Sequence, residues 1–431
     1  MFQTYEATLN FLYENLPMFQ RIGAAAIKPD LKNTLILCEV LGNPQLKFKS
    51  IHVGGTNGKG STSHMLASIF QSAGFKTGLY TSPHLKSFTE RIRINGHEVS
   101  KDYVVDFVNR ILPMIHTVKP SFFEITVAMA FDYFALEKVD IAVVEVGLGG
   151  RLDSTNVITP ALSVITNIGW DHMDLLGDSL EKIAGEKAGI IKPRIPVVIS
   201  ERQHDVENIF MEKASAMDSP LYFASDLLNA SMQSENGLVT FDVFENGAPV
   251  FQDLALPLQG VYQQKNILGV LQAVKVLQAQ GWQISRQHVR SGLENVISQT
   301  GLKGRWQVLN RIPMIVCDTG HNLDGMKEVL RQIKMQAYQN LFFVFGMVKG
   351  KDISTILELL PKDAYYFFCE AKIPRAVNAS SLFQHALEYQ LRGEVVPDVN
   401  DAIHHARRKA GDQDMIFIGG STYIVAEIDS L

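Results

Sequence analysis

The sequence predicts an α/β protein with two domains, and three observations support this fold class. The chain has 431 residues, more than one typical domain contains. Short apolar runs rich in β-branched residues alternate with helical segments, a pattern typical of parallel sheets covered on both faces. Near residue 299 this pattern breaks, and a second alternation of strands and helices begins. We therefore expect one domain at 1–298 and another at 299–431.

The first domain is expected to contain a mostly parallel sheet. Uninterrupted apolar runs predict strands at 51–53, 77–80, 139–146 and 161–166, and helices are predicted at about 61–72 and 264–280. Between residues 221 and 257 the apolar runs become short and alternating, with Asn and Gly turns. This change predicts a small antiparallel part within the same domain.

The second domain is expected to be a smaller, Rossmann-like α/β unit. Its buried strands are predicted at 313–317, 341–345, 365–369 and 415–418, with helices between them. Ligands of open parallel sheets bind beyond the carboxyl ends of the strands, so functional residues are expected at those ends.

Composition argues against several classes of function. Hydrophobic residues make up 46% and charged residues 20% of the chain, the balance of a soluble globular protein. A net charge of −5 argues against nucleic acid as a partner, because such proteins neutralise phosphates with Lys and Arg. We find no apolar run long enough to cross a bilayer and no secretory signal, so no membrane partner is expected. Three distant cysteines fit no metal spacing and favour a reducing compartment, so we expect a cytoplasmic protein, with the monomer as default.

A glycine-rich loop follows the first predicted strand. Residues 54–61 read Gly-Gly-Thr-Asn-Gly-Lys-Gly-Ser. Such a loop at a helix start presents backbone N–H groups to polyphosphate, and Lys59 adds a positive charge for the outer phosphates. The common P-loop has a hydroxyl directly after the lysine, whereas here Gly60 precedes Ser61. The sequence thus predicts a P-loop ATPase domain with the phosphate-binding residues Thr56, Asn57, Gly58, Lys59, Gly60 and Ser61.

Two further polar residues follow predicted strands. Glu145 lies near the end of one apolar strand, and His172 lies in the loop after the next strand along the chain. A buried charge is costly unless it is paired or bound to a cation. For either residue alone, a salt bridge or a hydrogen-bonded loop histidine is the simpler interpretation. Downstream of a phosphate loop, an acid and an imidazole from adjacent strand ends favour a shared divalent metal ion.

Longer segments resemble one family of enzymes. Residues 145–156 read Glu-Val-Gly-Leu-Gly-Gly-Arg-Leu-Asp-Ser-Thr-Asn, and residues 80–85 read Tyr-Thr-Ser-Pro-His-Leu. With the loop at 54–61, they are similar to the signatures of folylpolyglutamate and dihydrofolate synthases, which belong to the Mur ligase superfamily. Cell-wall ligases of that superfamily share the phosphate loop but usually lack the G-R-L-D-x-T-N run. The resemblance covers nearly the whole chain.

The resemblance implies ligands for individual residues. Mg²⁺ would be bound by Ser82, Glu145 and His172. The folate-type substrate would contact Phe123, Glu124, Leu152, Asp153 and Ser154. ATP, the co-substrate, would also contact Asn266, Arg305 and Asp318, and glutamate would contact His321 and Ser421.

Three residues are implied in catalysis, namely Lys59, His321 and a carbamylated Lys187. From the residues alone, Lys187 would be a solvated lysine on a polar helix face. Two positions depart from the family pattern. Tyr262 stands where histidine is common, and Thr319-Gly320 replaces Gly-Ala, which leaves the local contacts there open.

The implied reaction converts ATP, a folate-type carboxylate and L-glutamate into ADP, phosphate and a new amide, through an acyl phosphate. It leaves open whether the first glutamate, later glutamates or both are added. A P-loop ATPase that switches a protein partner is an alternative, but it leaves the 151–156 run unexplained. A cell-wall amino-acid ligase normally needs a further N-terminal domain, and only about 50 residues precede the phosphate loop, too few for a typical domain.

Overall fold

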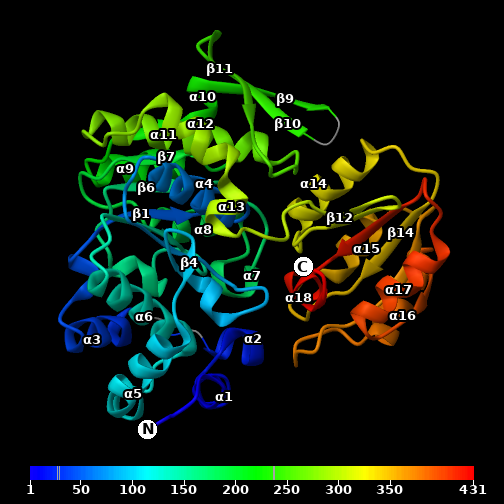
Figure 1. Ribbon diagram of the computed structural model, residues 1–431, viewed down its shortest axis with the longest axis horizontal. Helices are drawn as coiled ribbons and strands as arrows, with labels where there is room; N and C mark the ends of the chain where they lie inside the picture. Colours follow the sequence, from blue (N-terminus) through cyan, green and yellow to red (C-terminus); the bar gives the residue numbers. More distant parts are fainter. Residues whose placement is uncertain (27, 29, 236–237) are drawn as a thin grey trace. The chain divides into compact units, whose positions relative to one another are not determined.

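The computed structural model describes residues 1–26, 28, 30–235 and 238–431, and its chain packs into two compact units (Figure 1). The first unit comprises Met1–Gly169, Met173–Pro257 and Gln263–Gly301. The second comprises Trp170–His172, Leu258–Tyr262 and Leu302–Leu431. Two short segments from the first part of the sequence therefore pack with the second unit. A boundary at 298/299 between independently folding domains stays a prediction.

The first unit is built on an eight-stranded sheet in the order β4-β3-β2-β5-β1-β6-β7-β8. Its strands are β1 (Lys49–Gly54), β2 (Thr77–Tyr80), β3 (Ile92–Ile94), β4 (His97–Glu98), β5 (Ile141–Glu145), β6 (Leu162–Ile165), β7 (Val197–Ile199) and β8 (Leu221–Phe223). In the order β2-β5-β1-β6-β7-β8 all neighbouring strands pair in parallel, whereas β3 pairs in antiparallel fashion with both β2 and β4. The mostly parallel sheet predicted from the apolar runs is confirmed.

Helices cover both faces of this sheet (Figure 1). One face packs on α1 (Tyr5–Asn15), α3 (Lys32–Val40), α5 (Lys101–Val118) and α6 (Phe122–Leu136). On the opposite face lie α4 (Lys59–Ser72) and α11 (Gln263–Ala279). The unit also contains α2 (Phe19–Ile22), α7 (Met173–Leu176), α8 (Leu180–Ala188), α9 (Glu207–Ala216), α10 (Ala224–Leu227), α12 (Arg286–Glu294), α13 (Val296–Thr300), and the 3-10 turns η1 (Gly23–Ala26), η2 (Pro44–Leu46), η3 (Phe88–Arg91) and η4 (Ser154–Val157).

The predicted antiparallel part is a separate three-stranded sheet. It consists of β9 (Leu228–Glu235), β10 (Leu238–Glu245) and β11 (Ala248–Ala255), with β10 in the middle. It begins later than expected. Residues 221–223 form β8, which pairs in parallel with β7, because their apolar side chains extend the main sheet instead.

The second unit is a six-stranded sheet in the order β12-β13-β17-β14-β15-β16. Its elements are β12 (Gln307–Arg311), β13 (Met314–Cys317), α14 (Leu323–Lys334), β14 (Leu341–Phe345), α15 (Ile353–Leu359), β15 (Tyr365–Phe368), α16 (Ala379–Glu388), β16 (Arg392–Val395), α17 (Val399–Lys409), β17 (Met415–Gly419) and α18 (Thr422–Glu427). Helices α14, α15 and α16 pack on one face, and α17 and α18 pack on the other. Only β12 is antiparallel, so the expected α/β unit is confirmed.

The strand order of the second unit places β17, the last strand of the chain, between β13 and β14. The carboxyl ends of these three strands therefore meet at one edge of the sheet. Such a reversal of strand order is where open α/β sheets bind ligands.

Short-range sequence features fix where the helices begin. Ser121 and Glu124 form a capping box at the start of α6, in which each side chain accepts from the other's backbone N–H. Asn322 accepts from the N–H of Gly325 at the start of α14. Helix α4 instead follows Gly58, whose φ of 87° favours glycine.

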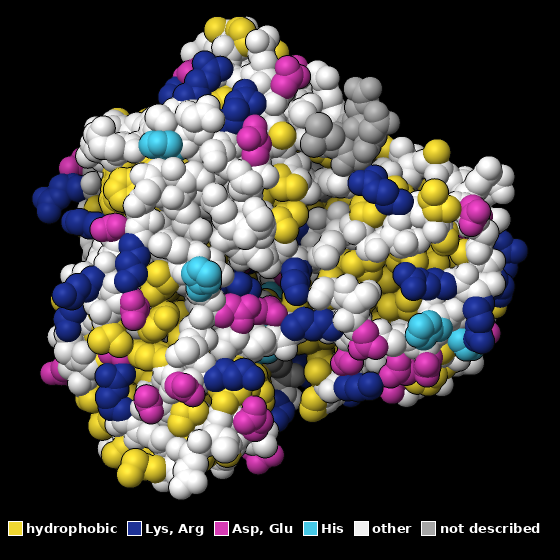
Figure 2. Space-filling view, in the orientation of Figure 1, with side chains coloured by type: hydrophobic (Ala, Val, Ile, Leu, Met, Phe, Trp, Pro, Cys, Tyr) yellow, Lys and Arg dark blue, Asp and Glu magenta, His cyan; other side chains and the backbone are white. Residues whose placement is uncertain are grey.

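Basic and acidic side chains are interspersed over the face shown in Figure 2. Among the described residues, no helix combines the length and apolar character needed to cross a bilayer.

His52, in the middle of β1, makes stability depend on pH. Its side chain is fully buried, Nε2 lies 2.9 Å from Thr155 Oγ1, and burial followed by the charge of Lys192 lowers its pKa to about 3. In the unfolded chain His52 binds a proton as the pH falls through about 6.5, whereas in the folded chain it stays neutral down to about pH 3. The free energy of unfolding should therefore fall as pH drops from about 6.5 towards 3, by at most about 1.4 kcal/mol per pH unit. Urea unfolding at pH 7 and pH 5 should show a smaller fall for His52→Gln; equal falls would contradict this account.

Candidate active site

The glycine-rich loop between β1 and α4 has no room for side chains at two positions. Gly55 has a φ of 135°, and a Cβ there would lie 1.9 Å from Thr166 Oγ1. At Gly58 a Cβ would lie 2.3 Å from Asn266 Oδ1. Both distances are shorter than real Cβ contacts. The loop can therefore pack against the end of β6 and the start of α11 only if positions 55 and 58 are glycine.

Hydrogen bonds from the segment after β6 hold the loop in shape. The N–H of Thr56 donates to Asn167 O at 2.8 Å, and that of Asn57 donates to Asn167 Oδ1 at 2.9 Å. The Thr166 hydroxyl donates to Asn57 O at 2.5 Å, and Thr56 Oγ1 accepts from the N–H of Gly169 at 3.0 Å. The loop is thus shaped by its own unit, which is the preorganisation that phosphate binding requires.

Two lysines converge on one carbonyl of this loop. Lys59 Nζ donates to Gly55 O and to Thr56 O, both at 3.1 Å, and Lys187 Nζ donates to Gly55 O at 2.9 Å. Lys187 lies on α8, as the helix prediction required, but it is only 3% exposed. Its interpretation as a solvated surface lysine is therefore wrong, because the helix face that carries it packs against the phosphate loop.

The start of α11 also contacts the start of α4. Gln263 Nε2 donates to Ser61 Oγ at 3.1 Å, and Asn266 Nδ2 donates to Gln263 Oε1 at 2.8 Å. Asn266 and Ser61, both predicted to bind ATP, are thus joined through Gln263. This chain of hydrogen bonds fixes the amide of Asn266 beside the loop.

Two of the three candidate metal ligands are brought together. The N–H of Ser82 donates to Glu145 Oε2 at 3.1 Å, and Glu145 is 4% exposed at the end of β5. His172 packs with the second unit, where its Nε2 lies 3.7 Å from Asp171 Oδ1. The expectation that Glu145 and His172 follow adjacent strands is wrong, because β1 lies between β5 and β6.

The donor set around Glu145 fits Mg²⁺. Among the described residues, no group of three or more His, Cys, Asp or Glu side chains could hold a metal by itself. Mg²⁺ does not require such a group, since it is commonly held by one or two carboxylates together with substrate phosphates and water. The buried carboxylate of Glu145, whose neighbour Ser82 also carries a hydroxyl, is the type of hard oxygen ligand that this mode of binding uses.

The residues expected to bind folate cluster around the first turn of α6 and the loop after β5. Phe123 packs so close to Gly147 that a Cβ there would lie 2.3 Å from its ring. Glu124 Oε2 accepts from the N–H of Ser121 at 2.6 Å and from Asn33 Nδ2 at 3.3 Å. The Asp153 carboxylate accepts from the N–H groups of Leu148 and Thr155, at 2.8 and 3.0 Å.

These contacts give the two carboxylates a structural part in shaping their loops. Burial raises the pKa of Asp153, and its hydrogen bonds oppose that rise. Ser154 is buried beside it at the start of η4, and Leu152 is half-buried. Their contact with folate stays a prediction.

In the second unit, Asp318 anchors the residues around the end of β13. Its Oδ2 accepts from the Tyr262 hydroxyl at 2.6 Å and from the N–H of Trp306 at 2.7 Å, and its Oδ1 accepts from the N–H of Gly320 at 2.7 Å. Burial raises the pKa of Asp318 above its ordinary value, and these hydrogen bonds only partly oppose that rise. The residues at both departures from the family pattern form hydrogen bonds at this site. Tyr262 binds Asp318, and the Thr319 hydroxyl accepts from Arg305 Nη1.

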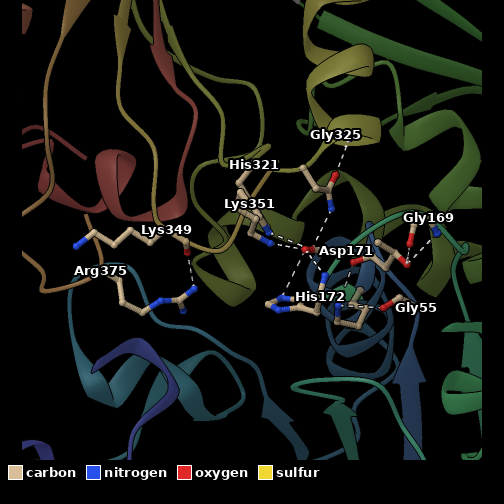
Figure 3. Close-up of polar contacts among 12 residues, drawn as sticks. Gly55, Gly169, Asp171, His172, His321, Gly325, Lys349, Lys351 and Arg375 are labelled. Carbon is tan, nitrogen blue, oxygen red and sulfur yellow. Dashed lines mark hydrogen bonds and ion pairs between the residues drawn. The ribbon is translucent and has the colours of Figure 1, made fainter. Parts of the chain in front are cut away.

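Asp171 forms the centre of a charged cluster in the second unit (Figure 3). Its carboxylate pairs with Lys351 Nζ, accepts from Asn322 Nδ2 at 3.1 Å and lies 3.5 Å from His321 Nε2. Burial by itself would raise the pKa of Asp171. The hydrogen bond to His321 and the nearby positive charges outweigh burial and hold this pKa well below its usual range. The side chains of His172, His321 and Lys351 all point at this carboxylate.

The two residues expected to bind glutamate follow neighbouring strands. His321 follows β13, and its Nδ1 lies 2.9 Å from Thr319 O. Ser421 follows β17 and caps α18, with its Oγ accepting from the N–H of Tyr423 at 3.2 Å. Because β13 and β17 are adjacent, both residues lie at the reversal of strand order in this sheet.

Comparison with known proteins covers both units of the chain. The model of the Mur ligase middle domain matches residues 53–274, and that of the Mur ligase glutamate ligase domain matches residues 304–422. A dihydrofolate synthase/folylpolyglutamate synthase from Bacillus subtilis is 33% identical and aligns over 99% of each chain. The folylpolyglutamate synthase of Lacticaseibacillus casei is 33% identical over 98% of this chain and 97% of its own. The chain belongs to the folylpolyglutamate synthase/dihydrofolate synthase family of Mur ligases.

Solved structures support the same assignment. Mycobacterium tuberculosis folylpolyglutamate synthase complexed with ADP has a TM-score of 0.86 at 29% identity, covering 98% of this chain and 96% of its own. The E. coli protein FolC in complex with DHPP and ADP has a TM-score of 0.84 at 27% identity, with the same coverage. As a member of this family the chain is an ATP-dependent ligase, and its fold is the predicted one.

The main residues that the sequence did not indicate are Asp171 and Lys351. Asp171 directly precedes the predicted ligand His172, but no spacing connects it to a lysine 180 residues later. A Gly-rich, lysine-containing run after β14, at 346–351, is the one feature that could have drawn attention to Lys351.

Two glycines at opposite ends of α4 test the loop. Gly58 and Gly74 share nearly the same backbone, with φ of 87° and 86°, but a Cβ at Gly74 would meet nothing within 4 Å. Both alanine variants should lose about 1 kcal/mol of stability through backbone strain. Only Gly58→Ala should also raise KM for ATP, by tenfold or more, because it displaces Asn266. Steady-state kinetics that gave both variants the same KM for ATP would contradict the packing argument.

Proposed function

We propose that this chain joins L-glutamate to a folate-type carboxylate through an acyl phosphate, and that ATP is converted to ADP and phosphate in the reaction. The observation that carries the proposal is the phosphate loop. Its glycines Gly55 and Gly58 pack against the end of β6 and the start of α11, and Lys59, the first residue of α4, donates back to the carbonyl of Gly55. The family relationship supports the same reaction.

The acyl phosphate follows from the chemistry of the carboxylate. A carboxylate is a poor electrophile, because its leaving group would be oxide. One of its oxygens attacks the γ-phosphorus of ATP, ADP leaves, and the resulting acyl phosphate carries a good leaving group. The glutamate amine then attacks the acyl carbon, loses a proton, and inorganic phosphate departs with the electron pair of the broken C–O bond. Lys59 and Arg305 neutralise the negative charge that develops on the phosphates.

The other predicted residues divide between the ligands. Thr56, Asn57, Gly58, Gly60 and Ser61 contact the phosphates of ATP, with the N–H groups of Gly58, Gly60 and Ser61 as backbone donors, because those of Thr56 and Asn57 already donate to Asn167. Asn266 and Asp318 bind the rest of the nucleotide, and His321 and Ser421 hold the incoming glutamate. The acceptor lies against Phe123, Glu124, Leu152, Asp153 and Ser154. The enzyme works as a cytoplasmic monomer.

Ser82 and Glu145, with His172 as a third ligand, would hold Mg²⁺. When bound, Mg²⁺ supplies positive charge to the phosphate oxygens and orients them. The protein's own part is to keep the Glu145 carboxylate buried and fixed by the N–H of Ser82, so that it is oriented before any ligand arrives.

Lys187 is carbamylated in the active enzyme. Its Nζ and that of Lys59 share the Gly55 carbonyl, so two ammonium groups would be held close together, one of them buried. Like charges disfavour each other, and burial disfavours an ammonium further. Loss of a proton from the ammonium removes this positive charge. The neutral amine then reacts with carbon dioxide to form the carbamate and releases a second proton. The product presents carboxylate-like oxygens beside the loop.

Removing Lys59 should slow the reaction about a hundredfold or more, since a phosphate cradle without its cation loses charge stabilisation in the transition state. The measurement is glutamate-dependent ADP release by Lys59→Ala. A variant with near-normal turnover would rule out the assigned role of the loop.

Carbamylation should be visible directly. After equilibration with isotopically labelled bicarbonate, the enzyme should show one carbamate resonance, which Lys187→Ala abolishes together with most activity. Lys192→Ala is the matched control, because Lys192 is half-buried and also donates to a backbone carbonyl, that of Asn156, at 2.8 Å. A fully active enzyme without the resonance would show that Lys187 works as an amine.

The acceptor is decided by a single comparison. ADP release in the presence of glutamate should occur with dihydropteroate or a reduced folate, and which of them reacts separates the first glutamate addition from later ones. Release with a uridine-linked muropeptide and with neither pterin would replace the folate assignment by a cell-wall ligase. Release that needs no small acceptor would indicate a protein-directed ATPase.

A further inference from the structure

Arg91 is a buried cation beside the segment that carries Ser82. It ends η3, is 3% exposed, and its carbonyl accepts from the N–H of Thr81 at 3.0 Å. This backbone bond continues the antiparallel pairing of β2 with β3 and fixes Arg91 next to the residue that precedes Ser82.

The Arg91 side chain is held on two sides by uncharged groups. Its Nε donates to His84 Nδ1 at 2.8 Å, which makes that ring nitrogen an acceptor. Its Cζ lies 5.4 Å from the centroid of the Phe122 ring. Phe122 in turn contacts the rings of Phe88 and Tyr13, at 5.9 and 5.6 Å between centroids. The guanidinium is therefore oriented within an aromatic cluster.

This charge has no described counter-charge. Among the described residues, no carboxylate pairs with Arg91, and nothing accepts from its Nη1 or Nη2. Arg93, two residues later and also buried, pairs with Glu98 at 3.1 Å. A buried arginine without an acid is unfavourable by itself, so the arrangement is explained if a ligand brings the negative charge.

We propose that Nη1 and Nη2 of Arg91 bind the carboxylate of the acceptor, a site that rests on the proposed folate-type substrate. A planar guanidinium matches a carboxylate with two parallel hydrogen bonds. The surrounding rings suit an acceptor whose carboxylate is attached to an aromatic ring. Phe122 directly precedes Phe123, the predicted folate contact, in the first turn of α6. Arg91 thus determines specificity for an acid over a neutral analogue.

Binding of an acid and of its neutral ester tests the proposal. Calorimetry would measure dihydropteroate and its methyl ester, each with an ATP analogue that cannot transfer its phosphoryl group. The intact enzyme should bind the acid about a hundredfold more tightly than the ester, and Arg91→Met should bind the two about equally. Arg110→Met is the matched control, because Arg110 also lies over a phenylalanine, at 5.5 Å from Phe107, but pairs with Asp132. It should keep the preference of the intact enzyme.

Thermal melting of the ligand-free variants separates binding from a structural role. Removing an unpaired buried charge should leave the Tm of Arg91→Met equal to or above that of the intact enzyme. A clear fall in Tm, a variant that does not fold, or a retained preference for the acid would overturn the site while leaving the ligase reaction standing. If the intact enzyme neither bound nor ligated dihydropteroate or a reduced folate, the proposed function would fall, and this site with it.

Discussion

The absence of side chains at Gly55 and Gly58 is the constraint on which the first unit depends. Each glycine faces a polar side chain at a distance that no Cβ tolerates, Thr166 after β6 and Asn266 in α11. The backbone of the loop is thereby pressed against elements separated from it by more than 100 residues of sequence. A loop packed in this way keeps its N–H groups in one arrangement, so phosphate binding requires little reorganisation.

The same packing explains why charged groups gather where they do. Burial of α8 against the loop brings Lys187 to the carbonyl to which Lys59 also donates, and at the end of β5 the buried Glu145 carboxylate accepts from the N–H of Ser82. In the second unit, the side chains of Lys351, His321 and Asn322 lie around the carboxylate of Asp171. In both arrangements several charged or polar groups meet within one unit, which is typical of functional sites in proteins.

The sequence predicted what periodicity and local motifs encode. The uninterrupted runs at β1, β2, β5 and β6 and the loop before α4 could be found because buried parallel strands are apolar throughout. The strands β3, β4 and β16 were not predicted, since they are short or carry charged residues, as in Arg392–Val395. Pairings such as Asp171 with Lys351 depend on which strand ends meet, and no local pattern records that.

The fate of the acceptor's oxygen tests the central claim, the acyl phosphate, most directly. If both carboxylate oxygens of dihydropteroate carry a heavy isotope, the oxygen that attacks ATP must leave with the phosphoryl group. The account predicts inorganic phosphate with one labelled oxygen per turnover and an amide that keeps the other. Unlabelled phosphate formed at the same rate as the amide would contradict it, because the bond between the acceptor's oxygen and phosphorus would then never have formed.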